Sequence, residues 1–553
     1  MFSNTLDLVK SVGRNWKSGL TVSIVSIPLA LALAITSGAT PTQGIITAFW
    51  AGLLAAVVGS SNYNIVGPTG ALSGILGSYA LINGYQVLPV VAVLSGLLIF
   101  IAYIFHLDKY IIFIPRAIVH GFTLGVAFII GLGQLDNALG ITGLDKVESV
   151  LGNTHLLLQN LEKTNWQVLL IFIFCTMFII VWDKKFPKVP GSAIAAFVSI
   201  ALMLALPALG YTPAILTLGD KYPSIHATLF ENPLAQFSLS ILLSKEIWQL
   251  AIATAIIAIL ETLLSGQIAD NMTDSKFDHR KEVLGLSIAN IGSGLMGGIP
   301  ATAALARTAL NIKSGATHKS SGLVSAIAVG VIAIFFIDFF KLLPMVAIAS
   351  ILVVVAIRMV EKKHFIHLIE NEKIAFALSL FVAIIVVVED PIIGILIGTV
   401  IALLIFVNKL SYGQTEVLLW KNGAITEALL KNEFLKKEVV DSDVVVYKIS
   451  GTMTYINMPA HLEAAEKIRN NNYVIVSLRY SFYADIDGID YLGEFISALK
   501  KNKNKHILLS GINKEVEKLI YKKDFYKQKQ VDGKIYNRTS DAINAITLEE
   551  GKD

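Results

Sequence analysis

Residues 297–310, GGIPATAALARTAL, decide how this chain folds. They lie between long apolar runs, yet they open with two glycines and a proline and contain Arg307. An ordinary membrane-spanning helix avoids both features, because proline interrupts helical hydrogen bonds and a charge is costly in hydrocarbon. A related stretch, VGPTGALSG, occupies residues 66–74. The two stretches together predict a pair of helices that are broken inside a bilayer.

The composition is that of an integral membrane protein with a soluble tail. Hydrophobic residues make up 54% of the 553 residues and charged residues 16%, with a mean hydropathy of +0.65. A soluble domain has about 45–50% apolar and about 25% charged residues. The net charge of +4 is too small to indicate a nucleic-acid partner. The single cysteine, Cys175, excludes an internal disulfide framework and a multi-cysteine metal site.

The apolar runs before residue 410 predict fourteen membrane segments, because a spanning helix needs about 20 apolar residues. They form two halves of seven, at about 19–208 and about 246–410, and the third segment of each half is short and rich in small residues. The segments are 20–38, 42–60, 68–83, 88–106, 115–133, 166–183, 190–208, 247–268, 282–296, 302–314, 322–340, 343–360, 373–389 and 392–408.

Loop charges predict the orientation of these segments. Lys and Arg collect on the cytoplasmic side of a membrane protein, and four basic clusters share one face if residues 1–18 are cytoplasmic. We therefore expect a multi-pass protein of the cell (inner) membrane with both termini in the cytoplasm and no cleaved signal peptide. The clusters are Lys10, Arg14 and Lys17; Lys184, Lys185 and Lys188; Lys276, Arg280 and Lys281; and Lys362, Lys363 and Lys373.

The composition changes after Lys409. Residues 411–439 are expected to be a linker, and residues 440–553 alternate apolar runs with amphipathic helices. This βαβαβα rhythm predicts a small cytoplasmic α/β domain.

The two broken segments are the third and the tenth in the series, which are corresponding positions in the two halves. Paired short, Gly/Pro-interrupted segments at corresponding positions indicate a transporter binding site. With seven segments in each half, the second half enters the membrane from the opposite side, so the repeats are inverted. The alternative is that the glycines only form tight packing seams between helices.

A helix that begins in mid-membrane leaves its first amides unbonded, with a partial positive charge at that end. Two such ends facing each other make an anion site. The small side chains of Ala71, Ala303 and Ala304 let an anion approach the amides, and Thr69 adds a hydroxyl. Arg307, about one turn into the second half-helix, strengthens the positive field.

Glu261 lies near the middle of the eighth segment. A carboxylate there costs about 2.5–3.5 kcal/mol on insertion scales, so such groups usually serve ions or protons. Glu261 is therefore expected to carry a proton or to ligate a coupling cation together with Ser265, one turn on. The alternative is a structural ion pair with Arg307.

These residues resemble the sulfate permease (SulP) family of anion transporters over nearly the whole chain. The matching pieces are SIPLALALAITSGATPTQGIITAFWAGLLAAVVGSS, VGPTGALS and PRAIVHGFTLG, and, most specifically, LETLL followed by IANIGSGLMGGIPATAALARTALNIKSGATHKSSG. The C-terminal part is similar to the STAS domain that ends most members.

The resemblance implies a core domain and a gate domain, a homodimer, and an anion held between the third and tenth helices against the first. Carried over to this chain, the anion site comprises Thr69, Gly70, Ala71, Ala303, Ala304, Leu305 and Arg307, with Leu29 and Leu33 from the first helix.

Three positions depart from the family pattern. Sodium-coupled bicarbonate members carry aspartate where this chain has Glu261 and a hydroxyl residue where it has Leu305, so proton coupling is favoured over sodium here. Phosphorylatable STAS domains carry a serine-containing turn, whereas this chain has Asp-Ile-Asp-Gly at residues 485–488. The domain is therefore expected to be structural or to bind a cytosolic partner.

The sequence predicts a secondary active transporter that moves a small inorganic oxyanion, sulfate or bicarbonate, by alternating access with cation symport. The alternatives are a channel-like conductor or an exchanger of the same fold, and a dicarboxylate or nucleobase permease. No GxxxxGK[ST] loop appears, so ATP is not the expected energy source. No nucleophile–base pair or metal-ligand spacing stands out, so we expect neither an enzyme nor a cofactor.

Overall fold

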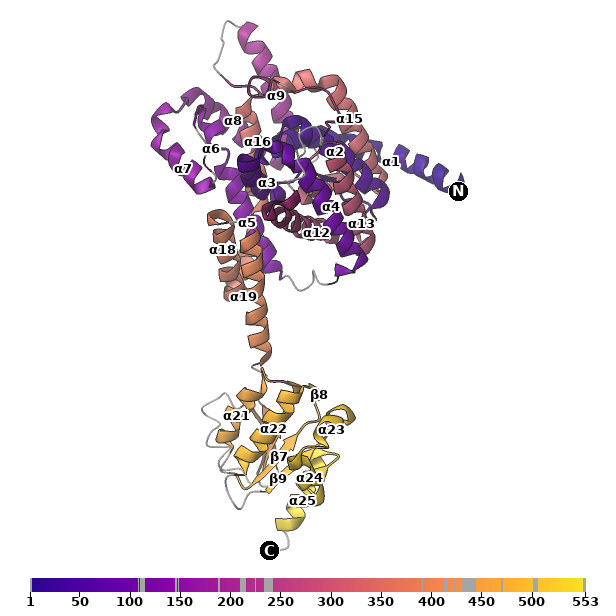
Figure 1. The fold of residues 1–553 in the computed structure, drawn as a ribbon, viewed down its shortest axis with the longest axis vertical. Coiled ribbons are helices and arrows are strands. Elements are labelled where there is room, and N and C mark those ends of the chain that lie inside the picture. Colours follow the sequence, from indigo (N-terminus) through magenta and orange to yellow (C-terminus); the bar gives the residue numbers. More distant parts are fainter. Residues whose placement is uncertain are drawn as a thin grey trace. The chain divides into compact units, whose positions relative to one another are not determined.

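The computed structural model describes residues 2–107, 109, 115–144, 147, 149–186, 189–208, 215–223, 225–232, 242–389, 391–411, 416–421, 424–429, 444–468, 471–500 and 506–550. The chain divides into two compact units, residues 1–400 and residues 401–553. Figure 1 shows the elements of both units with their labels.

The predicted fourteen segments all form helices, thirteen of them within the first unit and the last across the boundary at residue 400. Those of the first half are α1 (Phe2–Thr36), α2 (Pro41–Val58), α3 (Gly70–Asn83), α4 (Leu88–Ile104), α5 (Arg116–Leu132), α8 (Trp166–Lys185) and α9 (Gly191–Ala208). Those of the second half are α12 (Lys245–Thr273), α13 (His279–Leu295), α14 (Leu305–Lys313), α15 (Ser320–Lys341), α16 (Met345–Met359), α18 (Lys373–Val388) and α19 (Pro391–Ser411).

Shorter elements connect these helices. They are η1 (Tyr85–Val87), α6 (Leu135–Leu139), α7 (Val150–Gln159), η3 (Leu161–Lys163), α10 (Leu218–Lys221) and α17 (Lys362–Asn371). Two strands, β1 (Val66–Gly67) and β2 (Thr302–Ala303), precede α3 and α14.

The helices differ in their ability to cross a bilayer. Within the described residues, seven are long and apolar enough to do so, and α9, α18 and α19 contain shorter apolar stretches. The broken segments are shorter still, with 14 residues in α3 and 9 in α14. At about 1.5 Å per residue neither covers a hydrocarbon core of about 30 Å. Both are therefore half-helices, as the sequence predicts.

The packing of the helices repeats between the two halves. Helix α4 packs against α13, and its counterpart α15 packs against α2. In the same way α12 contacts α4 as α1 contacts α15, and α3 contacts α12 as α14 contacts α1. Equivalent pairs recur because the second half has the same order of helices as the first, in inverted orientation. This recurrence confirms the inverted repeats.

The helices form two groups. One contains α1 to α4 and α12 to α15, joined by the contacts just described. The other contains α5, α8, α16 and α18, in which α5 packs on α18 and α16 packs on α5 and α8 (Figure 1). These groups correspond to the predicted core and gate domains, and both broken helices belong to the core.

Helix α1 begins earlier than the predicted first segment. Residues 1–18 are expected to be a cytoplasmic N-terminus, but α1 starts at Phe2 and is continuous to Thr36. Asn15 and Ser18 are buried, and their side chains hydrogen-bond to Thr317 and Ser321. The end of this N-terminal segment is thus part of the packed membrane unit.

The second unit contains a six-stranded sheet in the order β10-β9-β7-β5-β3-β4. Strands β5, β7, β9 and β10 are parallel, whereas β3 is antiparallel to both β4 and β5. Two further strands, β6 and β8, form a separate parallel pair. The strands are β3 (Glu416–Lys421), β4 (Ala424–Leu429), β5 (Val444–Lys448), β6 (Gly451–Met453), β7 (Tyr473–Ser477), β8 (Ser481–Ala484), β9 (His506–Ser510) and β10 (Ile535–Tyr536).

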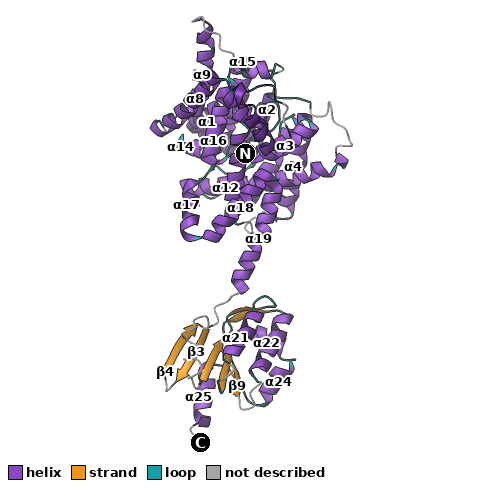
Figure 2. Ribbon diagram, turned by 90° about the vertical axis from the view of Figure 1, so that its left-hand side faces the viewer, coloured by secondary structure: helices purple, strands orange, loops and turns teal. Residues whose placement is uncertain are grey.

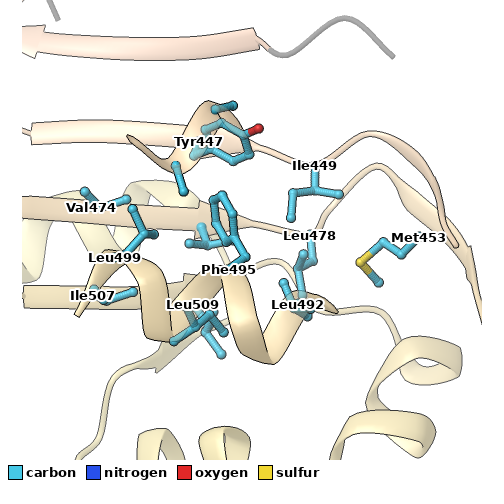
Figure 3. Packing of buried hydrophobic residues seen from close by; sticks show 14 of the residues in the cluster. Tyr447, Ile449, Met453, Val474, Leu478, Leu492, Phe495, Leu499, Ile507 and Leu509 are labelled. Carbon is cyan, nitrogen blue, oxygen red and sulfur yellow. The ribbon is translucent and has the colours of Figure 1, made fainter. Parts of the chain in front are cut away.

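Helices cover both faces of this sheet, so its strands are apolar on both sides (Figure 2). On one face Tyr447 packs against Phe495 of α22, with ring centroids 4.9 Å apart (Figure 3). On the other, Val446 belongs to a cluster with Ile546 of α25. The helices are α21 (Met458–Lys467), α22 (Ile486–Leu499), α23 (Lys514–Ile520), α24 (Asp524–Val531) and α25 (Thr539–Glu550).

The predicted boundary of the C-terminal domain is wrong. Residues 411–439 were expected to be a linker, but 416–421 and 424–429 form the β3–β4 hairpin of the sheet. The hairpin is part of the fold because β3 supplies the antiparallel partner of β5. The parts of the predicted linker at 412–415, 422–423 and 430–439 lie outside the described residues.

The buried Tyr447–His461 pair makes the stability of this domain depend on pH. The hydroxyl of Tyr447 lies 2.7 Å from Nδ1 of His461, and burial lowers the pKa of His461 to about 4. The unfolded chain binds this proton near pH 6.5. Below that pH the unfolded state is favoured, so the contribution is present above about pH 6.5 and is lost towards pH 4.

We expect the domain in the full-length protein to lose about 2 kcal/mol of stability between pH 7.5 and pH 5 through this residue. Hydrogen exchange of the β5 amides at both pH values measures the loss. The double variant Tyr447→Phe/His461→Leu removes both polar groups and should lose less. An equal loss in the variant and the parent would rule out His461 as the cause.

Candidate functional site

The two broken segments meet through their backbones. Strands β1 and β2 pair antiparallel, with Val66 opposite Ala303 and Gly67 opposite Thr302. The amide of Ala304 continues the pairing by donating to the carbonyl of Ile65 at 3.2 Å. An unpaired peptide group costs several kcal/mol in hydrocarbon, so extended chain in a membrane needs such a partner. The pairing brings the starts of α3 and α14 together.

Helix α3 begins without a side-chain cap. Its N-cap residue, Thr69, has extended backbone angles and could accept a hydrogen bond from the first turn, but no such bond forms. Its hydroxyl instead donates to Oε2 of Glu261 at 3.1 Å. The side chain of the N-cap residue, Thr69, therefore does not cap the first amides of α3, which begin at Gly70 and Ala71.

Helix α14 also begins uncapped, because its N-cap residue is Ala304, which has no polar side chain. The amide of Ala303 donates to the hydroxyl of Thr262 at 3.1 Å, and that of Ala304 is used by Ile65. Leu305 is thus the first residue of the helix, and its amide does not donate a hydrogen bond to either of these partners. Both half-helices present bare amides, as predicted.

A cavity of about 980 Å³ lies in front of these helix ends. Of the predicted anion-site residues, eight line it: Leu29, Leu33, Thr69, Gly70, Ala71, Ala304, Leu305 and Arg307. The predicted coupling residues Glu261 and Ser265 line it as well. Core helices α1, α3, α12 and α14 form one wall, and residues of α5 and α16 form the other.

The prediction for Ala303 is wrong. This residue is fully buried in β2 and does not line the cavity. Its amide is already bonded to Thr262, so it has no donor to offer a ligand. The alternation of a strand accounts for this, because neighbouring residues point to opposite sides. Ala304, which follows it, does line the cavity.

Arg307 connects the two half-helices. It is 2% exposed, and its Nη2 donates to the carbonyl of Pro68 at 2.6 Å. Its guanidinium lies against Gly67, where an added Cβ would be 2.7 Å from Nη1. The positive charge is therefore fixed in the cavity wall beside the start of α3. A Cβ at position 67 would occupy space that the guanidinium now fills, so glycine leaves room for it.

Glu261 lies in the same wall. The structure describes both Glu261 and Arg307, and it shows no direct ion pair between them. Its carboxylate accepts the hydrogen bond from Thr69. Ser265, the predicted second ligand of a coupling ion, donates to the hydroxyl of Thr308 at 3.0 Å. The hydroxyl proton of Ser265 is therefore committed to α14, and the structural alternative of a Glu261–Arg307 pair is not formed.

The mouth of the cavity is polar. Exposed side chains at this end include Arg116, Lys184, Asn271, Lys313 and Arg358. Among the described lining residues there are five Lys and Arg against three Asp and Glu. The excess of positive charge attracts anions to the mouth.

A cluster of three side chains at this mouth was given no role from sequence. Nδ1 of His120 lies 3.5 Å from Oε2 of Glu361, and its ring lies 3.7 Å from that of His364, between centroids. The available signal was the i, i+4 spacing of Arg116 and His120, which places both on one face of α5.

Comparison with known proteins supports this description. The model of the sulfate permease family matches residues 14–383. The protein named "Putative sulfate transporter YvdB" of Bacillus subtilis (strain 168) is 30% identical over 91% of this chain and 92% of its own length. The bicarbonate transporter BicA of Picosynechococcus sp. is 24% identical over 79% of this chain and 78% of its own.

The fold is that of a known anion transporter. Murine Slc26a9, an anion transporter solved in the inward-facing state, superposes with a TM-score of 0.80. The match covers 97% of this chain and 91% of that chain at 14% sequence identity. It therefore includes both the helical unit and the C-terminal α/β unit.

Gly67→Ala tests the contact between Arg307 and the first broken segment. The added methyl group should push the guanidinium away from the carbonyl of Pro68 and destabilise the membrane unit by about 1–3 kcal/mol. Thermal unfolding of the purified protein measures the loss. Gly131→Ala is the matched control, since an added Cβ there meets nothing within 4 Å. Equal melting temperatures for the two variants would contradict the contact.

Proposed function

Because the chain belongs to the sulfate permease family, we propose that it is a secondary active transporter of a small inorganic oxyanion, sulfate or bicarbonate. The anion binds between α3 and α14 and moves by alternating access together with a cation. The observation that carries the proposal is that both half-helices begin uncapped beside one buried arginine. The fold and the relatives support anion transport, and the site suggests how the anion is held.

The proposed anion contacts are mainly backbone amides. Gly70 and Ala71 at the start of α3, and Leu305 at the start of α14, line the cavity. A helix N-terminus favours a negative charge through its amides and its dipole. Arg307 adds a full positive charge in the cavity wall, where its side chain is buried. Leu29 and Leu33 of α1 complete the pocket on its apolar side.

The cavity geometry supports an alternating-access mechanism. Its mouth carries Lys184 and Arg358. Lys184 belongs to one of the basic clusters that the loop charges assign to the cytoplasm, and Arg358 precedes another in the sequence. Away from this mouth, the loop 225–232 packs on the core, where the indole of Trp50 donates to the carbonyl of Leu229 and the amide of Glu231 donates to Met296. The cavity would thus be open to one side of the membrane only.

We propose that Glu261 carries the coupling cation, and that this cation is a proton. A carboxylate accepts a proton without further ligands, whereas sodium needs several oxygen donors. Leu305 offers no side-chain oxygen, and the hydroxyl of Ser265 is bonded to Thr308. The donor set around Glu261 therefore suits a proton better than a sodium ion.

The remaining proposals follow from family membership. The protein lies in the cell membrane with both termini in the cytoplasm and forms a homodimer. The C-terminal α/β domain is a STAS domain with a structural role or a cytosolic partner. Its Asp485 caps α22 by accepting from the amide of Gly488. The turn at residues 485–488 is Asp-Ile-Asp-Gly, so it contains no hydroxyl for phosphorylation.

Uptake into proteoliposomes tests the function directly. The purified full-length protein is given a panel of sulfate, bicarbonate, a dicarboxylate, a nucleobase and chloride, with sodium and proton gradients imposed separately. Saturable uphill uptake of an oxyanion under a proton gradient is expected. Flux that does not saturate would indicate a channel-like conductor, and flux that needs an anion on the opposite side would indicate an exchanger.

Arg307→Ala should weaken anion binding by about tenfold to a hundredfold, because it removes a charge that is buried beside the site. Isothermal titration of the purified protein with the preferred anion measures the affinity. Arg280→Ala, which removes an exposed arginine at the start of α13, is the control. Unchanged affinity in a folded Arg307→Ala protein would exclude a direct role for this residue.

Glu261→Gln should abolish proton-driven accumulation while leaving anion exchange in place, because glutamine keeps the partner of Thr69 but cannot carry a proton. Uptake with and without a pH gradient separates the two activities. Glu246→Gln changes an exposed acid in the first turn of the same helix and should have no effect. If the Glu261→Gln protein still concentrates the anion, Glu261 is not the coupling residue.

A further inference from the structure

A second, much smaller cavity lies behind Arg307. Its volume is about 10 Å³, and its polar lining residues are Ser26 of α1, Asn64 before β1, Ser325 of α15 and Arg307 itself. Among the residues the structure describes, Arg307 is the one that lines both this cavity and the large one. Arg307 therefore forms a partition between them.

Two polar atoms in this small cavity have no partner in the chain. They are the hydroxyl of Ser26 and the amide oxygen of Asn64, and both are buried. Buried polar atoms are nearly always hydrogen-bonded, to the protein or to ordered water. Two orphan atoms lining one cavity beside a guanidinium therefore indicate a bound molecule that satisfies them together.

The amide of Asn64 cannot be turned to avoid this. Its Nδ2 donates to Oε1 of Glu282 at 2.8 Å and to the carbonyl of Thr262 at 3.3 Å. Exchanging oxygen for nitrogen would place an acceptor against a carboxylate and a carbonyl. Glu282 is itself held by the amides of Ser60 and Ser61, at 2.7 and 2.8 Å. The free acceptor of Asn64 is therefore fixed in direction.

Size and charge select the occupant. A volume of about 10 Å³ holds one water molecule and excludes any oxyanion. A metal cation is disfavoured because the guanidinium of Arg307 lines the same cavity. A water molecule can donate to the oxygen of Asn64, bond to the hydroxyl of Ser26 and accept from Arg307. A guanidinium has five N–H donors, and the one bond to Pro68 leaves others in need of acceptors.

We propose that Ser26, Asn64 and Ser325 hold one buried water molecule that fixes the guanidinium of Arg307 from behind. Together with the carbonyl of Pro68, the water keeps the positive charge in the partition and away from Glu261. Ser26 and Asn64 are thus positioning residues for the anion site. This role for the water rests on the proposed function, whereas the presence of the water does not.

The first test is a structure of the full-length protein in lipid nanodiscs, determined by cryo-electron microscopy at a resolution that shows ordered water. We expect a density peak within hydrogen-bonding distance of Ser26 Oγ, Asn64 Oδ1 and a nitrogen of Arg307. The absence of a peak, or a peak that does not contact Arg307, would overturn the proposal. The test needs no transport assay, so it is independent of the substrate.

The second test compares Ser26→Ala with Ser23→Ala. Both serines are buried in α1, but the hydroxyl of Ser23 is already bonded to the carbonyl of Leu20 at 2.8 Å. Ser26→Ala should lose the density peak and raise the KM for the preferred anion about fivefold, with the maximal rate unchanged. Ser23→Ala should change neither. A fall in maximal rate with an unchanged KM would indicate a structural effect and contradict the positioning role.

Gly52→Ala provides an independent variant that leaves both orphan atoms in place. Gly52 lines the small cavity, and an added Cβ would lie 3.3 Å from the carbonyl oxygen of Val66 and 3.4 Å from Cβ of Ala326. The methyl group should displace the water and raise KM as Ser26→Ala does. A normal KM in a Gly52→Ala protein whose structure shows no water would refute the positioning role. If the parent protein transports none of the anions but shows the peak, only the proposed function fails.

Discussion

The antiparallel pairing of β1 with β2 is the constraint on which the rest of the membrane unit depends. Extended chain cannot remain unpaired among apolar helices, and each strand is the partner of the other. The pairing uses the backbone as far as Ala304 and ends there. Both helices must therefore begin at this point, with their first amides pointing into the space between core and gate. The position of the site follows from backbone hydrogen bonding alone.

Side chains around the pairing then serve two purposes at once. Thr69 stands at the N-cap of α3, yet its hydroxyl bonds to Glu261 and leaves the helix uncapped. Gly67 provides a strand residue and the space for a guanidinium. These choices cost local stability, because a cap is worth about 0.5–2 kcal/mol and a buried arginine needs several partners. In return, the first amides of α3 stay uncapped and free to bind a ligand.

The sequence was sufficient to predict the helices, the inverted repeats and the two broken helices beside which the large cavity lies, because apolar length and paired Gly/Pro interruptions are local signals. It could not show which residues of the short strands face the cavity, and so the predicted anion site included Ala303. It also missed that Thr308 engages Ser265, since the contact joins α12 to α14. Long-range pairs of this kind have no periodicity that a single sequence displays.

The C-terminal boundary is a different case, because its signal was present. Asn422-Gly423 lies between two runs with β propensity, a pattern typical of a two-residue hairpin. The alternation of apolar runs and amphipathic helices begins only at about residue 440, so residues 411–439 were interpreted as a linker. The deciding fact is that, among the described strands, β3 pairs with β5 on the side away from β7.

The separation of Arg307 from Glu261 is the last consequence of this arrangement. Opposite charges in a cavity wall attract strongly, and a direct pair would cancel the field that an anion senses. Each group is instead held by a neutral partner, Pro68 for the arginine and Thr69 for the glutamate, and these partners are adjacent in sequence. Neutralising Glu261 with a proton would then strengthen the positive field at the anion site. In the proposed function, two charges fixed by one dipeptide would in this way couple the anion to the proton without touching.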